Sequence, residues 1–102
     1  MNEISGRGNY NWVDGKKYEG EWLNNKMHGK GHLIWADGKE YIGEFSEDKR
    51  HGHGLFKWTD GREYEGAWFK GKQSGTGYYK NNKGERKKGV WEDGKRMQWL
   101  DE

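Results

Sequence analysis

The chain repeats itself every 23 residues, and this period constrains its fold more than any other feature. The phrase DGKKYEGEW at residues 14–22 returns as DGKEYIGEF at 37–45 and as DGREYEGAW at 60–68. A strict repeat of this length is typical of an array in which each unit packs only on its neighbours. We therefore treat residues 1–102 as a single repeat domain. Its four copies follow one another without insertions, at residues 6–28, 29–51, 52–74 and 75–97.

Each copy contains two short runs in which glycine or aromatic residues alternate with mostly polar ones. Positions 8, 10 and 12 carry glycine or an aromatic ring, and so do positions 18, 20 and 22. This alternation is typical of strands with one buried face, and Asp-Gly between two such runs favours a hairpin. The glycine and aromatic residues of both strands are even-numbered and must lie on the same face. The numbers of two paired residues therefore sum to an even number, and the loop between the strands must hold an odd number of residues. We predict the three-residue loop Val13-Asp14-Gly15, with Gly15 in the left-handed conformation of a bulged turn.

The link between copies, LNNKMHG at residues 23–29, joins even positions in one copy to odd positions in the next. By the same parity its loop must hold an even number of residues. We predict that Trp22 faces Gly31 and that Gly20 faces Leu33, so that every ring lies across from a glycine. Such packing explains glycine in strand interiors, where it otherwise costs about 0.5–1 kcal/mol relative to alanine.

These hairpins predict an all-β fold, an elongated single-layer antiparallel β-hairpin meander of about eight strands. The composition agrees with it. Only 29% of the residues are apolar and 35% are charged, which leaves too little material for a two-layer core. Aromatic residues nevertheless reach 16%, with seven tryptophans, so the chain is not disordered. Burial must come from a thin layer of large rings.

The two ends of the array differ. In the fourth copy Asn81, Lys83 and Lys87 occupy the positions of Trp, Asp and Tyr, and we interpret this copy and the following KRMQWLDE as a polar cap. At the other end Gly6 begins in full register. Either the chain is cut from a longer array or this edge strand pairs with another chain, including by self-association.

The repeated phrases YEGEW, YIGEF and YEGAW, each preceded by DG and followed by a lysine-containing link and GxG, resemble MORN (membrane occupation and recognition nexus) repeats. The resemblance covers nearly the whole chain, and KKGVW in the fourth copy departs from the family's Tyr-x-Gly-x-Trp. It implies an elongated, curved β-hairpin sheet and a scaffold function, in cytoskeletal or ciliary assemblies or as an accessory domain beside a catalytic one. It also implies two binding modes, an aromatic groove for a partner segment and an affinity for acidic phospholipids.

No pattern in the sequence favours catalysis. GRGNYN, GKGHLI and GHGLFK lack the third glycine and the following helix of a phosphate-binding loop. The glutamates alternate onto the solvent face, where no burial tunes an acid–base pair. The four histidines lack carboxylates at ligand spacing. They are His28, His32, His51 and His53. We therefore predict a chain that is not an enzyme on its own and that has no cofactor and no metal site.

Three interpretations of function remain. The first is a protein-interaction scaffold whose aromatic face receives a partner segment. The second is a peripheral membrane module that binds acidic phospholipid, and the third is an accessory domain of a larger enzyme. The aromatic face comprises Tyr10, Trp12, Tyr18, Trp35, Tyr41, Trp58 and Tyr64.

The basic residues gather near the C-terminus. Between Lys70 and Lys88 seven basic residues oppose Glu85 alone, a surplus of six, so the rest of the chain carries −4 of the net charge of +2. This region is either a solvated end that keeps arrays from stacking or an anion-binding end for a lipid headgroup or an acidic protein tail. We do not expect nucleic acid as a partner, because the rings are committed to the sheet. The candidate anion-binding residues are Lys80, Lys83, Arg86, Lys87 and Lys88.

The sequence also limits the location. No apolar run approaches the roughly 20 residues that span a bilayer, and the first ten residues lack the apolar core of a secretion signal. There is no cysteine, which excludes disulfides and thiolate metal sites and leaves the redox compartment open. We expect a cytoplasmic protein associated with the cytoskeleton or a cilium, with peripheral membrane association as the alternative.

Overall fold

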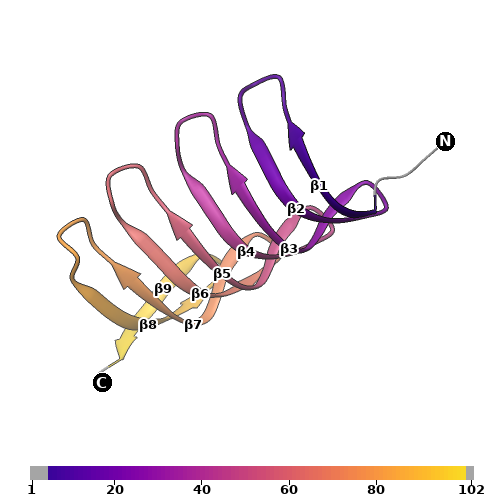
Figure 1. Cartoon of the computed structure of the whole chain (residues 1–102). Helices are drawn as coiled ribbons and strands as arrows, with labels where there is room; N and C mark the ends of the chain where they lie inside the picture. Colours follow the sequence, from indigo (N-terminus) through magenta and orange to yellow (C-terminus); the bar gives the residue numbers. More distant parts are fainter. Residues whose placement is uncertain (1–4, 101–102) are drawn as a thin grey trace.

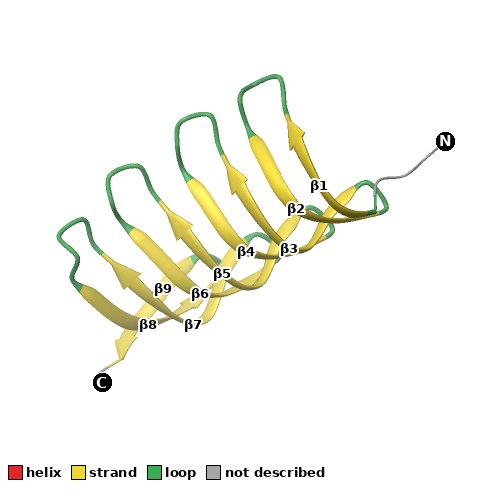
Figure 2. Ribbon diagram, viewed as in Figure 1, coloured by secondary structure: helices red, strands yellow, loops and turns green. Residues whose placement is uncertain are grey.

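The computed structural model describes residues 5–100, which form one antiparallel β-sheet without a helix (Figure 2). Each strand pairs with the next in sequence, and the single layer extends over 52 × 24 × 17 Å (Figure 1). The predicted single-layer hairpin meander is confirmed. The strands are β1 (Gly6–Asn11), β2 (Lys17–Leu23), β3 (Lys26–Ile34), β4 (Glu40–Ser46), β5 (Lys49–Lys57), β6 (Glu63–Phe69), β7 (Lys72–Lys80), β8 (Arg86–Glu92) and β9 (Lys95–Leu100).

The number of strands in the described residues is nine rather than the predicted eight or so. The additional strand is β9, which is formed by the residues KRMQWL. This segment belongs to the predicted polar cap. It extends the sheet instead, because Met97 and Trp99 alternate with polar residues as in a strand, and Trp99 and Leu100 pair with Gly89 and Lys88 of β8.

The Asp-Gly hairpins have the predicted three-residue loop. In the first copy Trp12 N–H donates to Lys16 O at 2.8 Å and Gly15 N–H donates to Trp12 O at 3.1 Å, which leaves Val13-Asp14-Gly15 as the loop. Gly15 has a φ of 99°, the left-handed backbone that a bulged turn requires. The Asp14 carboxylate also accepts the Lys16 N–H at 3.0 Å, which explains why aspartate precedes the glycine.

The loop between copies holds two residues, which confirms its predicted even number. Asn24 and Asn25 have φ values of 50° and 67°, as in a tight mirror-image turn. The predicted register is wrong. Trp22 lies opposite Met27, and Gly20 lies opposite Gly31.

The register differs because of a bulge in β3. The tight turn fixes Trp22 against Met27, and three residues, His28–Lys30, then oppose the single residue Glu21. The two extra residues bring glycine opposite glycine. Gly29, at the centre of the bulge, has a φ of 83°, which a side chain would disfavour. Leu33 consequently pairs with Tyr18 and not with Gly20.

The paired glycines form one continuous row across the sheet, which we call the glycine spine. A Cβ atom on Gly20 would lie 2.5 Å from Gly31 Cα and 2.6 Å from Lys30 O, so the two backbones approach too closely for any side chain. The long strands bend along their length (Figure 1). The spine comprises Gly8, Gly20, Gly31, Gly43, Gly54, Gly66, Gly77 and Gly89.

Rings do cover glycines, although in a different arrangement from the predicted one. On β2, β4 and β6 the tyrosine two residues before the spine glycine leans over the spine, so that a Cβ on Gly31 would overlap the Tyr18 ring. Its hydroxyl donates to the carbonyl of the residue three positions later, Glu21 for Tyr18 at 2.9 Å. Tyr41 and Tyr64 make the same bond at 2.8 and 3.0 Å. Each interior junction therefore depends on a tyrosine lying over glycines.

The core consists of the rings and aliphatic side chains on this one face, which we call the ring face. It is a strip one layer thick in which aromatic pairs meet edge to face, such as Tyr41 and Trp68 with centroids 5.4 Å apart. Burial therefore comes from large rings, as the composition predicts. The buried residues are Tyr18, Trp22, Met27, Leu33, Tyr41, Phe45, Phe56, Tyr64, Trp68 and Trp91.

Candidate functional site

A row of three tryptophans remains partly exposed on the ring face. Trp12, Trp35 and Trp58 stand at the ends of the first strands of their copies, immediately before the Asp-Gly loops, and each packs against the core without being buried in it. Successive members are two strands apart, or about 10 Å at ordinary strand spacing. We call the strip that they border the aromatic groove.

The other aromatic residues predicted for this face divide into two groups. Tyr18, Tyr41 and Tyr64 have 1%, 0% and 0% of their surface exposed, so they support the groove from within the core. Tyr10 is 45% exposed and packs against Trp12, with centroids 4.8 Å apart. The accessible part of the predicted aromatic face is therefore Tyr10 and the three tryptophans.

The groove contains two hollows, one near each end. The first, of about 530 Å³, lies between Trp12 and Met27. The second, of about 230 Å³, lies between Trp58 and Gln73. Met27 and Gln73 occupy the same position of the 23-residue repeat. This position was not predicted as part of the site, although it varies between apolar, basic and polar residues, as Met27, Arg50 and Gln73.

Arg50 occupies the equivalent position in the middle of the groove and fills the space there. Its guanidinium carbon lies 4.8 Å from the Trp68 ring centroid and 5.8 Å from that of Trp35. Arg50 Nη2 also donates to Gly71 O at 2.9 Å. Burial lowers the pKa of Arg50 from its ordinary value. The groove therefore has two open hollows separated by a cation held against rings.

Cations border the groove on the side of the Asp-Gly loops. Lys16 Nζ lies 4.7 Å from the Trp12 centroid, and the Arg62 guanidinium lies 5.3 Å from that of Trp58. The backbone N–H of Arg62 holds the pKa of Asp60 below its usual range, and Lys39 does the same for Asp37. The arrangement places Lys16 and Arg62 beside rings, and the charge of Arg62 is already paired, because its Nε lies 2.8 Å from Asp60 Oδ2.

The predicted anion-binding residues do not form one patch. Lys80 and Arg86 lie on the face opposite the rings, where Lys80 Nζ is 3.4 Å from Glu63 and Arg86 Nη2 is 3.6 Å from Glu65. Lys88 and Arg86 also approach Tyr78, at 5.9 and 4.0 Å from its centroid. Two of the candidate charges are thus paired with carboxylates.

The remaining two candidates have different surroundings. Lys87 is in register with Tyr79, on the ring face, and its Nζ lies 5.5 Å from the Trp99 centroid. Lys83 lies in the exposed loop before β8. In that loop the Asn81 side chain accepts the N–H groups of Lys83 and Glu85 at 2.9 Å, and so replaces the aspartate of the other copies.

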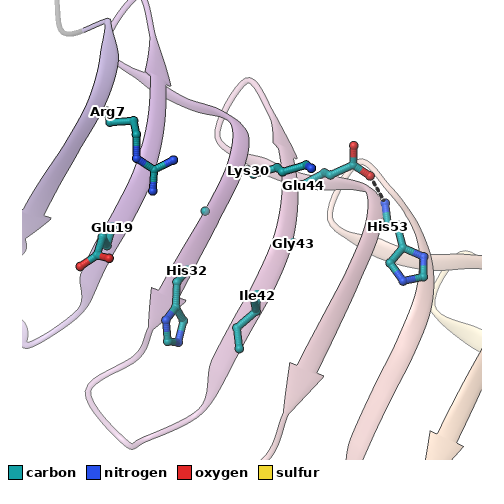
Figure 3. A pocket seen from close by; sticks show the side chains of 9 residues that line it. Arg7, Glu19, Lys30, His32, Ile42, Gly43, Glu44 and His53 are labelled. Atoms are coloured by element: carbon teal, nitrogen blue, oxygen red, sulfur yellow. Dashed lines mark hydrogen bonds between the residues drawn. The ribbon is translucent and has the colours of Figure 1, made fainter.

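The face opposite the rings carries a shallow polar hollow of about 550 Å³ (Figure 3). Figure 3 shows Arg7, Glu19 and His32 projecting from successive strands. Opposite charges alternate across the hollow, and His32 Nε2 lies 2.7 Å from Glu40 Oε1. Sequence reasoning missed this hollow, since it depends on the spine register. It offers no concentrated charge of one sign.

Metal binding has no support in residues 5–100, where no three His, Asp or Glu side chains are grouped to hold an ion. Two of the histidines contact side chains or backbone of neighbouring strands and loops. His53 Nε2 lies 3.6 Å from Glu65, and His51 Nδ1 accepts the Lys70 N–H at 3.5 Å. Nor does the described part of the chain contain a helix able to cross a bilayer.

The geometry defines a class: an open array of hairpins, each stacked on the next, with a row of partly exposed rings along one face. A family model, MORN repeat, matches residues 18–40, 41–61 and 64–86. These segments cover more than half of the chain, which belongs to the MORN repeat family. MORN repeats are non-catalytic modules known for protein and membrane interactions. No individual curated protein matches the chain.

Proposed function

We propose that this chain is a non-catalytic scaffold module that binds a segment of a partner protein along the aromatic groove, as part of a cytoskeletal or ciliary assembly in the cytoplasm. One observation carries the proposal. Trp12, Trp35 and Trp58 recur at one position of the repeat and stay partly exposed, although the tyrosines beside them are fully buried. A row of accessible rings on an otherwise charged surface is typical of an interaction site.

The spacing of the groove limits the chemistry of its partner. Its tryptophans repeat about every 10 Å, which three residues of an extended segment or seven residues of a helix span. Lys16 favours an acidic residue beside Trp12, whereas Arg62 beside Trp58 is already paired with Asp60. Because Arg50 fills the middle, we expect large apolar side chains at the two hollows and a small one between them.

The perturbed ionisable groups support a structural role. The tyrosines Tyr18 and Tyr64 have pKa values raised to about 12, with burial as the main cause. Burial also lowers the pKa of Arg50. The pKa values of Asp37 and Asp60 are lowered by the hydrogen bonds that their carboxylates accept from loop N–H groups. Among the described residues these shifts arise from packing and turns, and none belongs to a facing acid–base pair.

Site-specific photo-cross-linking tests the proposal. A benzoylphenylalanine at position 35 places the reactive group in the groove, and the same residue at position 42 places it on the opposite face. Ile42 is a matched control, since it lies on the neighbouring strand and is 40% exposed. We expect one partner to be captured from positions 12, 35 and 58 and not from 42. Equal capture from 42, or none from the groove, would contradict the proposal.

Acidic phospholipid is the second candidate ligand, because the surplus of six positive charges between Lys70 and Lys88 is the densest in the chain. Each cation near an acidic membrane contributes roughly 1 kcal/mol, screened by salt. If lipid binding is real, anionic vesicles should sediment the wild-type chain at low salt. They should not sediment the triple variant Arg86→Glu, Lys87→Glu, Lys88→Glu. Cross-linking from position 35 should persist in this variant.

A further inference from the structure

Two interior junctions between copies share a hydrogen bond that the fold makes at a bulge. In β3 and β5 the bulge glycines Gly29 and Gly52 have φ values of 83° and 85°. The residue after each glycine donates its N–H to a glutamate on the preceding strand. Lys30 N donates to Glu21 Oε1 at 2.6 Å, and His53 N donates to Glu44 Oε1 at 2.7 Å. The carboxylate oxygen lies 2.8 Å from where a Cβ of Gly29 would be and 2.7 Å from that of Gly52, too close for a side chain there.

The first strand has a glycine of the same conformation, and no strand formed by residues 5–100 lies on its outer side. Gly6 of β1 has a φ of 98°, yet nothing lies within 4 Å of its Cβ position. The Arg7 N–H, equivalent to those of Lys30 and His53, has no carboxylate partner among the described residues. Gly8 is also uncovered, since its Cβ would meet only the Trp22 indole, at 3.6 Å.

We propose that the outer edge of β1 is a docking site for a strand of the sequence Tyr-x-Gly-Glu-(Trp/Phe) from another polypeptide. In this complex the incoming tyrosine would lie over Gly8, as Tyr18 lies over Gly31. The incoming glycine would pair with Gly8, and the incoming glutamate would accept the Arg7 N–H. The site is distinct from the aromatic groove and adds a strand to the sheet.

The C-terminal edge of the described sheet in a second copy does not suit this site. That edge is β9, in which Trp99 lies opposite Gly89, in the place of a spine glycine. A strand presenting Trp99 to Gly8 would have an indole where the junction requires glycine. The Tyr-x-Gly-Glu sequences of this chain lie inside the sheet, in β2 and β4. A β2-type strand from a different polypeptide therefore fits this edge better than any strand that residues 5–100 of a second copy leave unpaired.

A synthetic peptide with the sequence of residues 16–23, KKYEGEWL, tests this inference. We expect fluorescence anisotropy to show saturable binding of the labelled peptide to the full chain, with the Arg7 amide protected from hydrogen exchange. The matched protein variant is Gly8→Ala. Its Cβ fits the free chain but would overlap the docked tyrosine, so it should weaken binding about tenfold or more.

Peptide variants give a second reading that does not depend on a protein variant folding. Changing the peptide glycine to alanine, or its second glutamate to alanine, should weaken binding to the wild-type chain by a similar factor. Three results would overturn the inference: no saturable binding, equal binding by Gly8→Ala, or protection of amides in β9 instead of at Arg7. None of them bears on cross-linking from position 35, so this site and the groove are tested separately.

Discussion

The junction between β2 and β3 and the junction between β8 and β9 begin alike and end in different registers. In the first, three residues of the bulge oppose Glu21 and the strands resume with glycine against glycine. In the second, Gln98 occupies the position of the bulge glycine Gly29. Gln98 does not have the positive φ of that glycine, and β9 carries one extra residue where β3 carries two.

This single step changes the face on which side chains lie, because strand residues alternate. Trp99 corresponds in sequence to Lys30, which lies on the face opposite the rings. In β9 it lies opposite Gly89 on the ring face, and its ring is 6.1 Å from that of Trp91. The junction with Gly29 thus continues the row of paired glycines, whereas the junction with Gln98 at that position places Trp99 over the row.

The first prediction separates the three tyrosine-dependent copies from the fourth, which has Lys87. Burial raises the pKa of Tyr18 and Tyr64 to about 12 and that of Tyr41 further, from 10.0. A raised folded pKa gives stability that is complete below pH 10 and is lost as pH rises towards 12. At pH 11 each of the three tyrosines should lower the free energy of unfolding by about 1.4 kcal/mol, and all three together by roughly 4 kcal/mol.

Denaturant titration at pH 8 and pH 11 measures this loss, and absorbance of tyrosinate should appear together with unfolding. Tyr41→Phe serves as the control. It removes one titrating group, so its own loss between the two pH values should be smaller by about 1.4 kcal/mol. A stability that stays constant to pH 11 would show that the tyrosines are not held neutral by the fold.

The second prediction concerns the covered C-terminal end. Trp99→Ala removes the ring from Trp91 and from the cations of Arg96 and Lys87, and it should lower the free energy of unfolding by about 2 kcal/mol. Met97→Ala, on the same strand and 58% exposed, should change it by under about 0.5 kcal/mol. Equal small effects would mean that β9 does not stabilise the end.

The third prediction compares two interior junctions and has the smallest effect. Ala67 occupies the position of Glu21 and Glu44, so the Thr76 N–H has no carboxylate to match theirs. Ala67→Glu should add this bond and raise the free energy of unfolding by about 1 kcal/mol. Glu44→Ala should lower it by a similar amount. Thermal melts of both variants would contradict this account of the junction if the two shifts had the same sign.

Much of the fold could be predicted from the repeat alone. Period-two alternation and Asp-Gly defined the hairpins, and parity defined the three-residue loop at Val13-Asp14-Gly15. The register between copies could not be predicted this way. Parity limits the loop to an even number of residues but does not show that two of them form the turn and that Gly29 then makes a bulge.

The candidate site was predictable in composition but not in accessibility. The tryptophan row was visible as a repeated column, and the structure leaves it partly exposed. The tyrosine column repeats equally well, yet its rings are buried because the glycine spine makes room for them. Arg50 was not identified, since a polar link gives no signal that one of its cations turns inward against rings.

The central claim is that interior junctions require bare glycine beneath a buried tyrosine, and one pair of melts tests it most directly. Gly54 and Gly8 occupy the same column of the repeat. A Cβ on Gly54 would overlap the Tyr41 ring, whereas one on Gly8 would lie 3.6 Å from Trp22 Nε1, an ordinary contact. We predict that Gly54→Ala costs about 3 kcal/mol and Gly8→Ala less than about 1 kcal/mol. Equal losses in the two variants would contradict the claim.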